Sequence, residues 1–181
     1  MYGLVNKAIE GLVCEEFGEE TWERIVEEAG VEEDTFVSLD AYDDAITYSL
    51  VGAASKVLDT PADQLLQAFG TYWTKYVGRE GYGPLMALED KPLGQFLAEL
   101  NEMHTLIAMS MPQLNPPTFE LSEPSPGTYD LSYASERAGL ALMVIGLLQG
   151  ILELKELEGS IEWLEKRDEG SERDVFRVRA A

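Results

Sequence analysis

Histidine, cysteine and basic side chains are scarce in this sequence of 181 residues. The one histidine, His104, excludes zinc sites with several histidines and iron sites with two. The one cysteine, Cys14, excludes an internal disulfide and a metal cluster held by several thiolates. A single imidazole can still complete a catalytic dyad or act as the one protein ligand of a cofactor metal.

The shortage of positive charge excludes further classes of function. Lys and Arg number 13 against 34 Asp and Glu, for a net charge of -21. Binding to nucleic acid or to an anionic membrane surface needs clustered basic side chains. The acidity suits a basic protein partner or a salt-rich cell interior, and it does not choose between them. No apolar run reaches about 18 residues and no secretory signal opens the sequence, so we expect a cytoplasmic protein.

The first part of the chain has apolar residues at helical spacing. We expect helices over 2–17, 22–29, Asp44–Leu58 with Asp44 as the cap, 62–76, a short one near Leu85–Leu88, and 92–111 with His104. Asn115-Pro116-Pro117 ends this helical part, because proline removes a backbone donor and restricts the residue before it.

The pattern changes to alternation after the double proline. We expect strands at Thr118–Leu121, Tyr129–Ser135, Ile161–Lys166 and Asp174–Arg179, with a turn at 123–127 and an apolar helix at Ala138–Leu157. The predicted fold is α+β: one domain, 1–181, with a helical N-terminal lobe (1–115) and a C-terminal lobe (116–181). The second lobe would hold a four-stranded antiparallel sheet in the order β-β-α-β-β.

Polar side chains alternate at Tyr133, Ser135 and Arg137. If all three lie on a strand they share one face, where two hydroxyls and a guanidinium suit a ligand with two anionic groups. The other interpretation is an ordinary solvent-exposed strand face, with Arg137 paired to a neighbouring Glu.

His104 follows an apolar stripe and is expected to point inward. A buried neutral imidazole offers the lone pair that a haem iron needs, and it is equally an ordinary core histidine bonded to a carbonyl. Pro116-Pro117 has two interpretations as well: a helix stop, or a rigid ring against a planar cofactor. The apolar run Ala138–Leu148 is either plain core or the wall of a ligand pocket.

Six segments carry a family resemblance. They are Met1-Tyr2-Gly3-Leu4-Val5-Asn6, Ala68-Phe69-Gly70-Thr71-Tyr72-Trp73, His104, Pro116-Pro117, Tyr133-x-Ser135-x-Arg137 and Gly146-Leu147-Leu148-x-Gly150. Together they resemble the haem nitric oxide/oxygen binding (H-NOX) family, which includes the haem domain of soluble guanylate cyclase. The resemblance covers nearly the whole chain.

The resemblance implies a role for each matching position. It implies haem b (iron protoporphyrin IX) between the lobes, with His104 as the iron ligand. Tyr133, Ser135 and Arg137 would hold the haem propionates, Pro117 would keep the porphyrin out of plane, and Val5, Trp73 and Met143 would line the gas-binding side.

The resemblance also bears on which gas binds. Family members that hold O2 use a Tyr hydroxyl from the helix after the Tyr-x-Ser-x-Arg motif, whereas Ala138–Leu148 contains no Tyr, Ser, Asn or His. Trp73 offers an indole N–H. A lost hydrogen bond to a charged acceptor costs about 1.5–3 kcal/mol, or one to two decades of affinity. We therefore expect an NO sensor, with CO as a further ligand and O2 disfavoured.

The output of such a sensor is expected to pass to a separate effector, such as a histidine kinase or a cyclic-di-GMP enzyme, and we expect no enzymatic activity in this chain. Two alternatives stay open. One is an O2-binding haem sensor or carrier. The other is a haem-free interaction module in which His104 is core.

Overall fold

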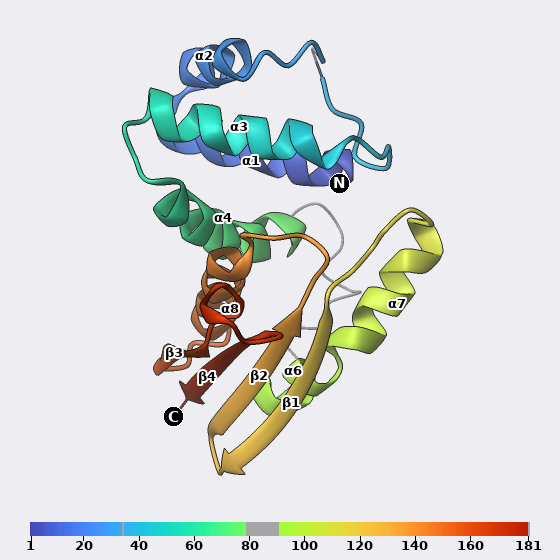
Figure 1. Ribbon diagram of the computed structural model, residues 1–181, viewed down its shortest axis with the longest axis vertical. Helices are drawn as coiled ribbons and strands as arrows, with labels where there is room; N and C mark the ends of the chain where they lie inside the picture. Colours follow the sequence, from blue (N-terminus) through green and yellow to red (C-terminus); the bar gives the residue numbers. More distant parts are fainter. Residues whose placement is uncertain (34, 79–90, 181) are drawn as a thin grey trace. The chain divides into compact units, whose positions relative to one another are not determined.

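The computed structural model describes residues 1–33, 35–78 and 91–180, and it is α+β as predicted (Figure 1). The chain forms two compact units, Met1–Phe69 and Gly70–Ala181. The lobe boundary expected between 115 and 116 stays a prediction; the change from helix to strand does fall there. The short helix expected near Leu85–Leu88 lies outside the described residues.

The first unit consists of helices packed on one apolar cluster. Its helices are α1 (Gly3–Phe17), α2 (Glu19–Ala29), α3 (Asp44–Val57) and the start of α4 (Ala62–Val77). The buried cluster contains Val13, Ile25, Phe36, Leu50, Ala53 and Ala54. Their helical spacing made these helices predictable. The expected cap of α3 was wrong by one residue, because the Asp43 carboxylate accepts from the Ala45 amide and Asp44 pairs with the terminal amine.

The second unit combines helices with a sheet. Its elements after α4 are α6 (Leu93–Ala98), α7 (Leu100–Ser110), β1 (Thr118–Ser125), β2 (Thr128–Ala134), α8 (Ala141–Leu154), β3 (Gly159–Glu165), the short 3-10 helix η2 (Arg167–Glu169) and β4 (Asp174–Ala180). The sheet order is β1-β2-β4-β3, and each neighbouring pair is antiparallel. The four-stranded antiparallel sheet is therefore confirmed.

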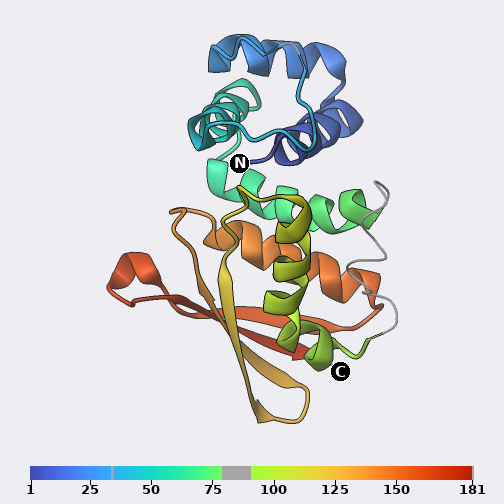
Figure 2. The ribbon, with the colours of Figure 1, turned by 90° about the vertical axis from the view of Figure 1, so that its right-hand side faces the viewer.

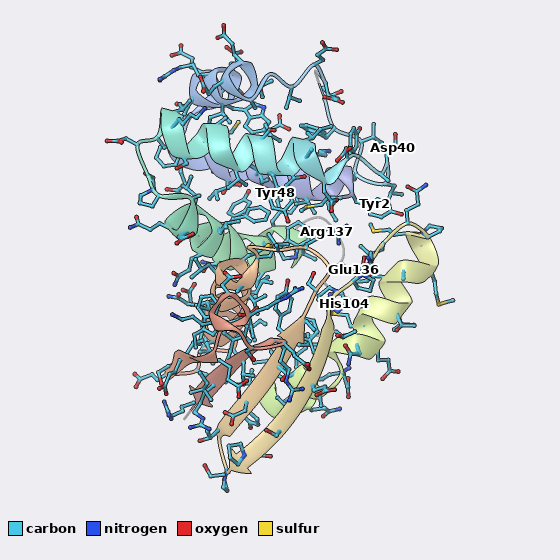
Figure 3. All side chains as sticks on the ribbon, in the orientation of Figure 1. Tyr2, Asp40, Tyr48, His104, Glu136 and Arg137 are labelled. Atoms are coloured by element: carbon cyan, nitrogen blue, oxygen red, sulfur yellow. The ribbon has the colours of Figure 1, made fainter. Side chains whose placement is uncertain are left out.

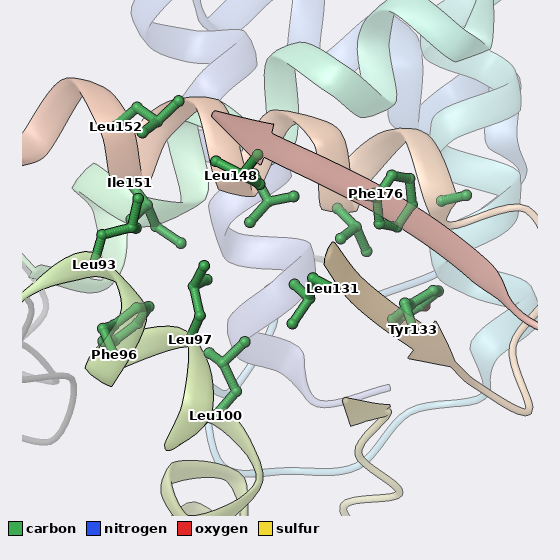
Figure 4. Packing of buried hydrophobic residues seen from close by; sticks show 13 residues of the cluster. Leu93, Phe96, Leu97, Leu100, Leu131, Tyr133, Leu148, Ile151, Leu152 and Phe176 are labelled. Atoms are coloured by element: carbon green, nitrogen blue, oxygen red, sulfur yellow. The ribbon is translucent and has the colours of Figure 1, made fainter. Parts of the chain in front are cut away.

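One face of this sheet carries the core of the unit. Leu131 of β2 and Phe176 of β4 are register partners and are fully buried. Leucines of α6 and α7 and the apolar side of α8 pack against them, as Figure 4 shows. The other face is polar: Arg177 donates two bonds to its register partner Asp130. The period-2 alternation of these strands produces the two faces.

Glycine lets α4 and α8 approach closely within this unit (Figure 2). A Cβ built on Gly70 would lie 2.1 Å from the carbonyl oxygen of Met143, which no side chain tolerates. The Thr71 hydroxyl also donates to the Gly146 carbonyl at 3.1 Å. This contact fixes the position of α8 relative to the end of α4.

Several elements differ from expectation. The single helix expected over 92–111 is wrong: it is two helices, α6 and α7, separated at Glu99, whose φ of -93° and ψ of 4° depart from helical backbone. Residues 123–125, predicted as part of a turn, continue β1, and the turn lies at Pro126-Gly127. The helix expected at Ala138–Leu157 is shorter, because Gly139 has a φ of 76° and Glu156 a φ of 54°, outside helical backbone. Of the helices in the described ranges, none combines the length and apolar composition that a membrane span requires.

Candidate haem-binding site

The His104 imidazole is half-buried on α7 (Figure 3), and one of its ring nitrogens is hydrogen-bonded. Its Nδ1 lies 2.7 Å from the Leu100 carbonyl oxygen, one helical turn earlier. A carbonyl only accepts, so Nδ1 carries the proton and Nε2 keeps a lone pair. Burial lowers the pKa of His104, opposed by the bond to Leu100, so the ring is neutral at pH 7. This tautomer is the one that ligates a metal through Nε2.

An aromatic contact ties His104 to the start of the sheet. The imidazole stacks on Phe119 of β1, with ring centroids 5.6 Å apart and planes at 26°. Phe119 in turn packs against the ring of Tyr133 at 5.7 Å. His104 and Tyr133, 29 positions apart in the chain, are thus joined through one phenyl ring.

Asn101 fixes this arrangement by a reciprocal pair of hydrogen bonds. Its side-chain amide donates to the Phe119 carbonyl at 2.7 Å and accepts from the Phe119 amide at 2.9 Å. Pro117 is two residues before Phe119 and is half-buried. The side chain of Asn101 therefore holds the start of β1, which Pro117 immediately precedes, against the helix of His104.

The strand face predicted for Tyr133, Ser135 and Arg137 is wrong in its geometry. The strand β2 ends at Ala134, because both of its partners end there: β4 begins at Asp174 opposite Tyr133, and β1 begins at Thr118 opposite Ala134. Tyr133 is buried at 6% exposure on the core face. Ser135 and Arg137 lie in a bend instead, where the Ser135 hydroxyl accepts from the Arg137 amide at 3.1 Å.

This bend is bonded to the segment before the double proline. An Arg137 guanidinium N–H donates to the Asn115 carbonyl at 2.8 Å. The side-chain amide of Asn115 donates to the Glu136 carboxylate. Two hydrogen bonds, one donated from each side, thus join Asn115 to the segment 135–137. Figure 3 labels Glu136 and Arg137 of this segment.

The residues expected on the gas side divide between the two units. Trp73 and Met143 belong to the second unit, on the helices α4 and α8 that meet at Gly70. Both side chains are half-buried. Val5 is half-buried on α1 in the first unit.

Sequence reasoning missed Asn101, Asn115 and Phe119. Asn101 had a local signal, since it lies three residues before His104 on the same side of the helix. Asn115 and Phe119 act through contacts between segments about 20 residues apart. No periodicity in the sequence reports such contacts.

The sequence of the chain is similar to those of known haem-domain proteins. A family model described as Haem-NO-binding matches residues 2–163. The soluble guanylate cyclase gcy-31 of Caenorhabditis elegans is 29% identical over 98% of this chain, and gcy-34 of the same organism is 30% identical over 85%. The chain spans 26% and 23% of their lengths, respectively.

Solved structures show the same fold. An H-NOX protein from S. oneidensis, in its Fe(II)NO state, matches with a TM-score of 0.90 and 17% identity over 100% of this chain and 99% of that one. An unliganded Fe(II) H-NOX protein from K. algicida gives 0.86 and 21%, over 100% and 97%. An oxygen-binding H-NOX domain related to soluble guanylate cyclases gives 0.83 and 18%, over 99% and 95%. The chain therefore belongs to the Haem-NO-binding family, the H-NOX haem domains that bind gases.

Proposed function

We propose that this chain is a cytoplasmic haem-based NO sensor that signals to a separate effector protein and catalyses no reaction itself. The observation that carries the proposal is the bond from His104 Nδ1 to the Leu100 carbonyl. It selects the tautomer with a lone pair on Nε2, which is what an iron ligand requires. Haem b, when bound, supplies an iron at which a diatomic gas binds.

The remaining polar residues fit the carboxylates of such a cofactor. A guanidinium binds a carboxylate with two parallel N–H groups, and Arg137 is held at the bend by Asn115. We infer that Ser135 and Tyr133 add hydroxyl donors to the same propionates. Pro117 is a rigid ring on the chain leading to Phe119, and we infer that it bears on the plane of the porphyrin.

The gas side favours NO over O2. Bound O2 carries partial negative charge and is held by a hydrogen-bond donor, whereas NO binds ferrous haem without one. We infer that Val5, Trp73 and Met143 line this side, and two of these three side chains offer no hydrogen-bond donor. The first turns of α8 present apolar side chains there, so we propose NO as the signal and CO as a further ligand.

The spectrum of the reduced protein tests this proposal. We expect a Soret band from bound haem that changes on addition of NO, and no stable oxy spectrum in air. His104→Gly should lose the haem unless imidazole is supplied. Thr105→Gly is the matched control, since it places glycine at the next, exposed position of α7. Unchanged haem occupancy in His104→Gly would show the ligand assignment to be wrong.

Different spectra would support one of the two alternative functions. An air-stable oxy form would replace the NO sensor by an O2 sensor or carrier, with the Trp73 indole as donor. No Soret band after haem addition would support a haem-free interaction module.

An effector, such as a histidine kinase or a cyclic-di-GMP enzyme, responds to the sensor only if it binds the NO form and the NO-free form with different affinity. The net charge of -21 favours a basic surface on that effector.

A further inference from the structure

The bend at residues 135–137 has a second anchor, on the side away from Asn115. It is Arg167, the first residue of η2 in the connection between β3 and β4. One of its guanidinium N–H groups donates to the Ser135 carbonyl at 2.6 Å. The two residues are 32 positions apart, so the contact joins two connections at the same end of the sheet.

Arg167 is itself held by a buried carboxylate. Asp174 is 6% exposed, and its Oδ1 accepts from the Arg167 amide and from the Trp163 indole, both at 3.1 Å. In the register of β2 and β4, Asp174 lies opposite Tyr133. The carboxylate therefore places the backbone of Arg167 beside the last pair of β2 and β4, close to where the bend begins.

This placement explains how an exposed arginine can hold a bend. A hydrogen bond from an exposed arginine contributes little if both the backbone and the side chain must be ordered to form it. Here the backbone of Arg167 is already ordered by Asp174, and only the side chain remains to be fixed. The Ser135 carbonyl is then held, and with it the turn in which the Ser135 hydroxyl accepts from the Arg137 amide.

We propose that Arg167 is a positioning residue for cofactor binding: it holds the bend 135–137 in the shape in which Ser135 and Arg137 meet the haem carboxylates. The inference rests on the proposed function. Arg167 acts through its bond to the Ser135 carbonyl, and the aspartate at 174 acts through Arg167.

The test compares Arg167→Ala with Arg173→Ala in the full chain as purified. Arg173 lies in the same connection and pairs with Glu120 at 2.6 Å, so its replacement removes the same charge from the same region. Two rates are measured: amide hydrogen exchange at 135–138, and transfer of haem to a haem-scavenging protein. Both are repeated in about 1 M salt, where the Debye length falls to about 3 Å.

We expect Arg167→Ala to raise both rates about tenfold, and to do so at either salt concentration, with Arg173→Ala like the parent protein. Equal rates in the two variants would overturn the inference. An effect that disappears in high salt would overturn it too, since Arg167 would then act as a surface charge. A parent protein that takes up no haem overturns the proposed function, and with it the role in cofactor binding; hydrogen exchange would still report separately whether Arg167 holds the bend.

Discussion

The two compact units differ in charge and in what they contribute to the candidate site. Residues 1–69 hold three basic side chains against sixteen acidic ones, and residues 70–181 hold ten against eighteen. Of the eight candidate site residues, Val5 alone comes from the first unit. The candidate site residues thus lie mainly in one unit, while the other carries most of the net negative charge, -13 of -21.

The basic side chains of the second unit have local tasks. Arg137 and Arg167 hold the bend after β2, and Arg177 pairs with Asp130 across the sheet. In the first unit, Lys56 pairs with Glu28 on the surface, with both side chains well exposed. These three arginines of the second unit therefore each join two segments that are distant in the sequence.

The largest expected effect tests whether the two cores are independent. Phe176→Ala removes a fully buried ring from the sheet unit and should cost about 3–5 kcal/mol of unfolding free energy. Leu50→Ala, in the helical unit, should cost about 2–5 kcal/mol. Urea unfolding gives both values, and hydrogen exchange locates them. Equal loss of protection in both units for either variant would contradict independent cores.

An intermediate effect compares a glycine from each unit. Gly70→Ala should cost about 1–3 kcal/mol, because its Cβ would meet the Met143 carbonyl. Gly52→Ala on α3 has nothing within 4 Å and should gain about 0.4–1 kcal/mol from a less flexible unfolded chain. Thermal unfolding measures both changes. If Gly70→Ala is as stable as the parent, α4 and α8 do not meet there.

The smallest expected effect is on how the unfolding free energy depends on pH in acid. Arg177 donates two hydrogen bonds of 2.7 Å to Asp130 and lowers the pKa of that carboxyl from 3.8. The folded state then binds the proton less readily than the unfolded state, so the pair stabilises the fold above pH 3.8 and this stability is lost as the pH falls through the lower folded pKa.

Asp130→Asn should abolish this part of the acid dependence. Unfolding free energy measured from neutral to acid pH checks it. Glu28→Gln, which removes the exposed pair with Lys56, serves as the control and should change little. If the unfolding free energy of the parent protein and of Asp130→Asn depends on pH in the same way, the Arg177–Asp130 pair contributes no more than the exposed Lys56–Glu28 pair.

The helices and the strand alternation were predictable because both depend on neighbours in the sequence. The apolar spacing in residues 2–17 and the alternation in 174–179 predict α1 and β4 almost to the residue. The end of β2 was not predictable, because it depends on where its two partners, β1 and β4, begin in the register of the sheet. Ser135 and Arg137 therefore lie in a bend that their own alternation did not indicate.

The order of residues by itself determined the acidity, the single imidazole, the α+β class and the segments that match the family, since each is a property of composition or of short-range pattern. The tertiary structure alone decided how Asn101 and Phe119 join the helix of His104 to the sheet, and how Arg167 reaches Ser135. Those outcomes depend on hydrogen bonds and ring contacts between segments that are distant in the sequence, and only the packed chain brings their atoms within reach.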